Sequence, residues 1–260
     1  THLFLTYCIK FVFKPRKMNI KAIIPNFITL LNLLSGCIAV VFAAGNQFEL
    51  TFFFVCLGIF LDFFDGFFAR LFKVQSPLGV QLDSLADMVT SGLVPGFVMF
   101  KLIFNYQNEG VSALDDYSPA NLILPLVGFF ITVGSCYRLA KFNIDTRQTD
   151  SFIGLPTPAN ALFIVSIPLI IASTEMTFLI DALTNQYILV VISIVSTYLM
   201  NAEIPLFSLK LKNFSWQNSK LQLVFLVLSL ILLVTLQIVA LPLIILLYVL
   251  MSVIQNKITS

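Results

Sequence analysis

The stretch that decides the fold is Leu61–Val89, LDFFDGFFARLFKVQSPLGVQLDSLADMV. Four aspartates stand in it among phenylalanines and leucines: Asp62, Asp65, Asp83 and Asp87. A carboxylate at the centre of a membrane helix costs roughly 2.5–3.5 kcal/mol on insertion scales, so four independent ones would cost on the order of 10 kcal/mol. We therefore expect these acids to lie near a membrane interface, to be compensated by a bound cation, or both.

The composition of the whole chain is that of a polytopic membrane protein. Of its 260 residues, 58% are hydrophobic and only 11% are charged, whereas a soluble domain carries roughly a quarter charged residues. The mean hydropathy is +0.96. A net charge of +2 does not indicate a nucleic-acid partner. The four cysteines show no paired spacing and the single histidine is His2, so disulfide, zinc and histidine-based chemistry are not expected.

Eight apolar windows indicate membrane spans. They lie at about 24–44, 48–70, 84–104, 120–141, 159–179, 186–206, 221–238 and 241–255, and Pro242 separates the last two. Lysines and arginines gather before the first window and in every second connection, while acids occupy the other connections. The positive-inside rule then places both termini in the cytoplasm. The predicted fold is an all-α membrane bundle of about eight helices, a six-helix core plus a C-terminal hairpin.

The chain divides into three parts by its patterning. Residues 1–17 precede Met18, which opens MNIKAIIPNFITLLNLLSG as a natural start would, and we interpret them as an upstream or non-native extension. Residues 18–206 form the predicted membrane domain. Residues 207–260 form a loop and a transmembrane hairpin, for which the pattern predicts no role.

The four aspartates are spaced so that each pair shares one face of a helix. Asp62 and Asp65 are three residues apart at the cytoplasmic end of the second span, and Asp83 and Asp87 are four apart at the beginning of the third. A connection over about residues 71–82, containing Ser76-Pro77 and Gly79, returns the chain as an antiparallel neighbour. We therefore expect all four carboxylates to converge at the cytoplasmic interface.

Converging carboxylates need a counter-charge. A site made only of oxygen ligands suits a hard divalent cation, Mg²⁺ or Mn²⁺. Paired metals of this kind stabilise phosphate oxygens during displacement at phosphorus, so the acids point to a phosphoryl substrate. The alternatives are an ion pathway and a structural ion-pair cluster in which Arg70 balances one of the acids.

The same residues resemble the signature of the CDP-alcohol phosphatidyltransferases, D-G-x-x-A-R, eight residues, G-x-x-x-D-x-x-x-D. It reads here as Asp65-Gly66-Phe67-Phe68-Ala69-Arg70, followed by Gly79, Asp83 and Asp87. The resemblance implies that an alcohol hydroxyl attacks the β-phosphorus of CDP-diacylglycerol and releases CMP.

The resemblance also implies a role for each signature residue. Asp62, Asp65 and Asp83 are expected to bind two metal ions, with Asp87 as the catalytic base and a further ligand. Gly66, Ala69, Arg70 and Gly79 are expected to bind CDP-diacylglycerol. For Gly66 and Ala69, close packing between membrane helices is the alternative reading.

Asn26 and Thr29, in IPNFITLLNLLSG, share one face of the first span near the same interface. The resemblance indicates contact with the nucleotide diphosphate, and a helix cap by Asn26 is the alternative.

Arg138 and Lys141 are the predicted serine- or phosphate-binding residues. They belong to YRLAKFNIDTRQTDSFIGLPTPANA, Tyr137–Ala161, which is similar to the phosphatidylserine synthase branch of the family. That branch uses L-serine, whose carboxylate requires a cation. A basic loop that only sets the topology is the alternative.

Other acceptors would leave the reaction class unchanged: glycerol 3-phosphate, inositol phosphate or a phospholipid. A cation transporter and a purely structural membrane protein are the readings from other classes. The expected partners are CDP-diacylglycerol, L-serine and membrane lipids, and the resemblance adds a candidate homodimer. The expected location is the cell (inner, cytoplasmic) membrane, with the active site at the cytoplasmic face.

Overall fold

The computed structural model describes residues 20–107, 119–145, 153–207 and 220–259. Over these ranges the chain forms helices and no strand, apart from an isolated bridge between Ile153 and Pro205. The extension predicted over residues 1–17, and His2 within it, lie outside the described residues. The all-helical part of the fold prediction is confirmed for the described chain.

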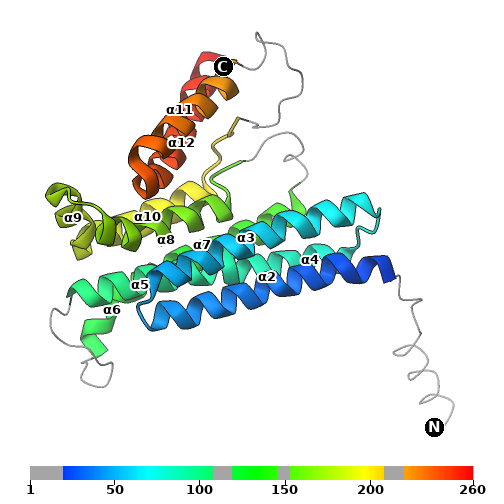
Figure 1. The fold of residues 1–260 in the computed structure, drawn as a ribbon, viewed down its shortest axis with the longest axis horizontal. Helices are drawn as coiled ribbons and strands as arrows, with labels where there is room; N and C mark the ends of the chain where they lie inside the picture. Colours follow the sequence, from blue (N-terminus) through cyan, green and yellow to red (C-terminus); the bar gives the residue numbers. More distant parts are fainter. Residues whose placement is uncertain (1–19, 108–118, 146–152, 208–219, 260) are drawn as a thin grey trace.

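The first helices form an antiparallel pair. They are α2 (Ile20–Ala44) and α3 (Phe48–Leu71), joined by a turn in which Asn46 has a φ of 57°. The Ser35 hydroxyl donates to the Phe54 carbonyl at 2.7 Å, and the Thr51 hydroxyl reaches the Ala39 carbonyl at 3.5 Å. These hydrogen bonds join the two helices, which run side by side in Figure 1.

The third apolar segment is one long, bent run. It consists of α4 (Pro77–Asp87), the π-helix η1 (Met88–Leu93) and α5 (Val94–Gln107). The predicted connection over residues 71–82 is wrong, because α3 continues to Leu71 and α4 already begins at Pro77. The Ser76 hydroxyl accepts from the Gly79 amide at 3.1 Å and Pro77 occupies the first turn, so the sequence caps the helix there.

The remaining helices complete the bundle around α5. The chain passes through the short turns η3 (Pro119–Leu122), α6 (Ile123–Leu126) and η4 (Val127–Phe129) into α7 (Phe130–Ile144), and then through α8 (Thr157–Ser173), α9 (Thr177–Thr184) and α10 (Gln186–Asn201). In the run Pro77–Gln107, 67% of the 18-residue apolar window is buried, against 33% or less of the windows in the other candidate spans of the described chain. α5 is therefore the central helix, and Val98, Met99, Leu102 and Ile103 lie in the core.

The last helices, α11 (Lys220–Leu236) and α12 (Ala240–Thr259), form a hairpin around the turn η5 (Gln237–Val239). The rings of Phe225 and Tyr248 lie 5.6 Å apart, although 23 residues of straight helix would separate them by about 35 Å. Ile245 and Val249 of α12 pack against the main core. The hairpin thus rests on the bundle beside α8 and α10 (Figure 1).

Five apolar runs of the described chain are long enough to cross a membrane: Lys21–Ala44, Phe48–Leu71, Pro77–Gln107, Ile123–Ile144 and Leu221–Asn256, the last of which contains the hairpin turn. A sixth is obtained if α9 and α10, bent by 73°, count as one span. This agrees with a multi-pass membrane bundle. The count of eight spans and the cytoplasmic termini stay predictions.

Candidate active site

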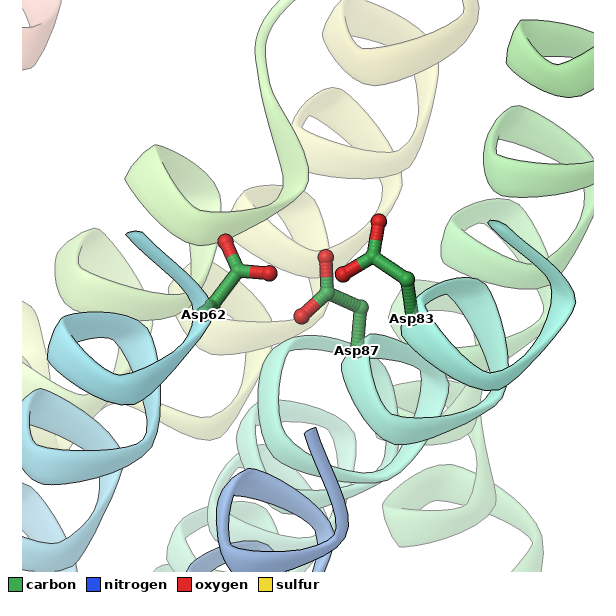
Figure 2. Close-up of side chains that lie close together, drawn as sticks. All are labelled: Asp62, Asp83 and Asp87. Atoms are coloured by element: carbon green, nitrogen blue, oxygen red, sulfur yellow. The ribbon is translucent and has the colours of Figure 1, made fainter. Parts of the chain in front are cut away.

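Three of the four aspartates form one cluster. Carboxylate oxygens of Asp62, Asp83 and Asp87 all lie within 4.8 Å of one another. Asp62 comes from α3, while Asp83 and Asp87 lie one turn apart on α4, and Figure 2 shows the three side chains converging. The helix spacing predicted from the sequence therefore brings acids from two helices to one point.

Asp65 lies one turn farther along α3 and is not one of the three acids whose oxygens lie within 4.8 Å of one another. Its side chain is 5% exposed, and its Oδ2 accepts a hydrogen bond from the Thr29 hydroxyl at 2.5 Å. Within that limit the convergence of the four acids is seen for three of them, while Asp65 hydrogen-bonds to a hydroxyl of α2. The assignment of Asp65 as a metal ligand stays a prediction.

The cluster has the properties of a site for a hard cation. Its ligand atoms are all carboxylate oxygens, which Mg²⁺ and Mn²⁺ prefer. Asp83 Oδ1 is buried and has no hydrogen-bond partner in the described chain. Three carboxylates this close repel one another, and a buried acceptor without a donor is costly. A divalent ion would remove both penalties, so the residues present fit the metal that the spacing predicted.

A cavity of about 580 Å³ adjoins the acids and is open to the surface. Asp65 and Asp83 line it, and so do all six residues predicted to bind CDP-diacylglycerol, namely Asn26, Thr29, Gly66, Ala69, Arg70 and Gly79. The volume is in the range of roughly 300–1,000 Å³ that is usual for ligand pockets. Side chains from α2, α3 and α4 thus share one hollow beside a cluster of acids.

Among the described residues, no neighbouring helix packs closely against Gly66. A Cβ placed on it would approach only the Nη2 atom of Arg70, at 3.8 Å, so the helix face there is open. The structure therefore disfavours the helix-packing alternative for Gly66. Gly79 differs, because a Cβ on it would lie 3.3 Å from Ser76 Oγ and 3.5 Å from Asn26 Oδ1. Its small size lets the start of α4 approach α2.

The two predicted cationic residues occupy a separate, small cleft. Arg138 of α7 is 8% exposed, and its Nη1 donates to the carbonyl oxygens of Ile153 at 2.9 Å and Met200 at 2.6 Å. Lys141, one turn on, lies 3.2 Å from Glu203. Arg138 therefore ties the chain before α8 to the end of α10. Binding of serine or phosphate by these two residues stays a prediction.

The C-terminal half of α7 nevertheless lies against the acidic helix. The Asn143 amide donates to the Ser84 hydroxyl at 2.9 Å, and Ser84 directly follows Asp83. The basic end of α7 and the acidic α4 are thus neighbours.

Two buried polar residues beside the cluster were not identified from the sequence, Asn32 and Thr90. Asn32 lies three residues after Thr29 on α2 and donates to Asp87 Oδ1 at 3.2 Å. Because Asn32 continues the polar face of Thr29 in an otherwise apolar helix, the sequence could have identified it as a residue of the site. Thr90, three residues after Asp87, continues the face of Asp83 and Asp87 in the same way, although it lies in the π-helix.

Comparisons with known proteins show the family to which the sequence is similar. Residues 22–199 match the family model described as CDP-alcohol phosphatidyltransferase. Proteins named CDP-diacylglycerol–serine O-phosphatidyltransferase are similar to the chain. The one from Bacillus subtilis (strain 168) is 34% identical over 146 residues, which cover 55% of this chain and 73% of that protein.

Two further relatives carry the same name. The protein from Helicobacter pylori (strain J99) is 34% identical over 146 residues, covering 54% of this chain and 55% of its own length. The protein from Methanocaldococcus jannaschii is 32% identical over 142 residues, covering 55% and 58%. The matched part of the chain thus spans little more than half the length of these two relatives.

Proposed function

Because the chain belongs to the CDP-alcohol phosphatidyltransferase family, we propose that it transfers a phosphatidyl group from CDP-diacylglycerol to the hydroxyl of L-serine, giving phosphatidylserine and CMP. One observation supports this above the others. The six residues expected to bind CDP-diacylglycerol line a single cavity together with Asp65 and Asp83. Asp83 also belongs to the three-acid cluster, so the nucleotide and the phosphoryl chemistry would meet at that residue.

The cavity would hold the cytidine diphosphate part of the donor. Asn26 and Thr29 of α2 offer polar atoms on one wall, and Arg70 of α3 brings a cation for a phosphate oxygen. The open helix face at Gly66 lets the nucleotide approach the backbone closely. The acyl chains would then extend into the surrounding membrane.

The acids would carry the transfer step. Asp87 accepts the proton of the serine hydroxyl, the serine oxygen bonds to the β-phosphorus, and the bond from that phosphorus to the CMP oxygen breaks. Asp62, Asp65 and Asp83, with Asp87, would hold one or two divalent ions, Mg²⁺ or Mn²⁺. When bound, these ions neutralise the diphosphate and stabilise the departing CMP.

The choice of serine rests on the names of the relatives and on the basic end of α7. Arg138 and Lys141 are the candidate contacts for the serine carboxylate or a phosphate. Serine needs only one compensating cation, whereas a phosphate-bearing acceptor calls for a denser basic cluster. Glycerol 3-phosphate and inositol phosphate are the acceptors against which serine must be tested.

The experiment measures CMP formation by the purified protein in detergent or vesicles. CDP-diacylglycerol is supplied with one labelled alcohol at a time: serine, glycerol 3-phosphate, inositol phosphate or a phospholipid. Label entering lipid only with serine supports the proposal. Label entering with another alcohol reassigns the acceptor, and cation flux without CMP release contradicts the reaction altogether.

The same proposal places the site at the cytoplasmic face of the cell membrane, with both termini on that side. A cysteine introduced at Gln75, which lines the cavity, would react with an impermeant thiol reagent from the cytoplasmic side of vesicles. Labelling only from the other side would contradict this orientation. The homodimer stays a prediction.

A further inference from the structure

A fully buried amide lies directly behind the proposed base. Asn32 of α2 has no exposed surface, and its Nδ2 donates to Asp87 Oδ1 at 3.2 Å. The residue cannot touch a substrate, because no part of it reaches solvent. Its contact with Asp87 limits the rotation of that carboxylate while Asp87 stays in the three-acid cluster (Figure 2).

Thr90 completes the hydrogen bonding of this amide. Its hydroxyl donates to Asn32 Oδ1 at 2.8 Å and lies 3.1 Å from the Asn32 backbone oxygen. Because an ionised carboxylate can only accept, the NH₂ group of the amide faces Asp87 and leaves its Oδ1 to the Thr90 hydroxyl. A flipped amide would instead point an oxygen at the carboxylate. The three residues thus form a chain of hydrogen bonds, called the relay below. Thr90 of η1 donates to Asn32 of α2, and Asn32 donates to Asp87 of α4.

The backbone around Thr90 is shaped to admit the relay. Thr90 lies in η1, and π-helical turns are rare and frequent at functional sites. Two glycines face it from neighbouring helices. A Cβ on Gly36 would lie 2.5 Å from Thr90 Oγ1, and one on Gly58 would lie 2.5 Å from Thr90 Cγ2 and 2.8 Å from Asn32 Oδ1. Glycine at both places leaves room for the hydroxyl and the amide.

We propose that Asn32 and Thr90 are positioning residues for phosphatidyl transfer, acting only through Asp87. This rests on the proposed function for its kinetic consequence, but the geometry of the relay does not depend on the acceptor. Asn32 keeps the Asp87 carboxylate directed at the other acids, and the Thr90 hydroxyl holds the Oδ1 atom of Asn32 so that its amide stays in place. Loss of either lowers the rate of the transfer step and leaves donor binding in the cavity nearly unchanged.

The test compares matched variants of the full chain. Asn32→Leu removes the amide at similar volume and is expected to lower kcat about ten- to a hundredfold. Thr90→Val removes only the hydroxyl and is expected to lower kcat about three- to tenfold, and Thr90→Ser, which keeps it, restores most of the rate. KM for CDP-diacylglycerol changes less than about twofold in each. Thr51→Val, a buried hydroxyl at the far end of α3, controls for lost packing.

A double variant separates this role from a structural one. Because Thr90 acts through Asn32, the pair Asn32→Leu/Thr90→Val is expected to lose no more kcat than Asn32→Leu alone. Independent packing defects would multiply instead. Multiplied losses, or equal kcat in Thr90→Val and Thr90→Ser, overturn the proposal.

A readout without turnover distinguishes failure of the relay from failure of the proposed function. The Mn²⁺ concentration giving half-maximal thermal stabilisation is expected to rise about three- to tenfold in Thr90→Val, and to stay near the wild-type value in Thr90→Ser. If serine is not used, but Thr90→Val needs more Mn²⁺ than wild type and Thr90→Ser does not, the proposed acceptor is wrong and the relay is supported. If CMP forms normally and the two Thr90 variants bind Mn²⁺ alike, the relay is refuted.

Discussion

Replacing Asp83 by asparagine is expected to stabilise the metal-free protein while abolishing its response to divalent ions. Asp83 shares the three-acid cluster with Asp62 and Asp87, whose carboxylate oxygens lie within 4.8 Å of one another. An asparagine keeps the shape of the side chain but removes one negative charge from two repelling pairs. The site would thus gain stability without the ion and lose the ability to bind it.

The magnitude follows from the separation of the charges. At 4.8 Å, the largest separation in the cluster, and an effective dielectric constant of roughly 20, each ionised pair of carboxylates repels by about 3.5 kcal/mol. The two pairs involving Asp83 then sum to about 7 kcal/mol before rotation of the side chains and salt reduce the repulsion. A net gain of about 1–3 kcal/mol corresponds to a rise in Tm of about 2–12 °C for a protein of this size.

The assay is thermal unfolding in detergent micelles, with EDTA and then with a series of Mg²⁺ or Mn²⁺ concentrations. Wild type is expected to gain about 2.7 kcal/mol at an ion concentration one hundred times the Kd, and Asp83→Asn to gain almost nothing. Asp181→Asn, an exposed carboxylate on α9, is the matched control and is expected to change neither value. If Asp83→Asn melts below wild type in EDTA, or wild type ignores divalent ions, the idea of a repelling metal site is refuted.

Three further outcomes are expected. Asp87→Asn is expected to abolish CMP release and to raise the Mn²⁺ concentration for half-maximal thermal stabilisation at least as much as Thr90→Val, because Asp87 belongs to the three-acid cluster; normal turnover would rule out Asp87 as the base. Gly66→Leu fills the cavity from an open helix face, so KM for CDP-diacylglycerol is expected to rise at least tenfold with Tm within about 2 °C of wild type; a large fall in Tm would show that packing requires the glycine. Arg138→Met removes the donor to two buried carbonyls and is expected to cost about 2–4 kcal/mol of stability. Unchanged stability together with a higher KM for serine would instead make Arg138 an acceptor-binding residue.

Much of the site could be predicted because helical spacing alone determines it. Asp62 is three residues from Asp65 and Asp83 four from Asp87, so two apolar helices had to bring these acids to neighbouring faces. The remaining difference concerns Asp65. Whether it turns to the other acids or to Thr29 depends on one rotamer and a hydroxyl of another helix, which no periodicity encodes.

Other features depend on contacts distant in the sequence. Arg138 meets the carbonyl of Met200, 62 positions later, so its backbone partners could not be read from its surroundings in the chain. The pair Ser76-Pro77 is typical of a helix start and could have predicted that α4 begins at Pro77. The expected start was instead taken from the apolar window, which begins several residues later. The π-helix had no sequence signal, whereas Thr90, three residues after Asp87, could have been identified from helical spacing.

The π-turn η1 holds about one residue more than an α-helical turn would. Deleting one residue from Met88–Leu93 would therefore turn it into ordinary α-helix, and Met99 and Ile103 would keep their places in the interior. The loss would be local, because Thr90 would no longer face Asn32. Among natural relatives we therefore expect a shortened segment to fold with the same bundle but without this threonine–asparagine contact.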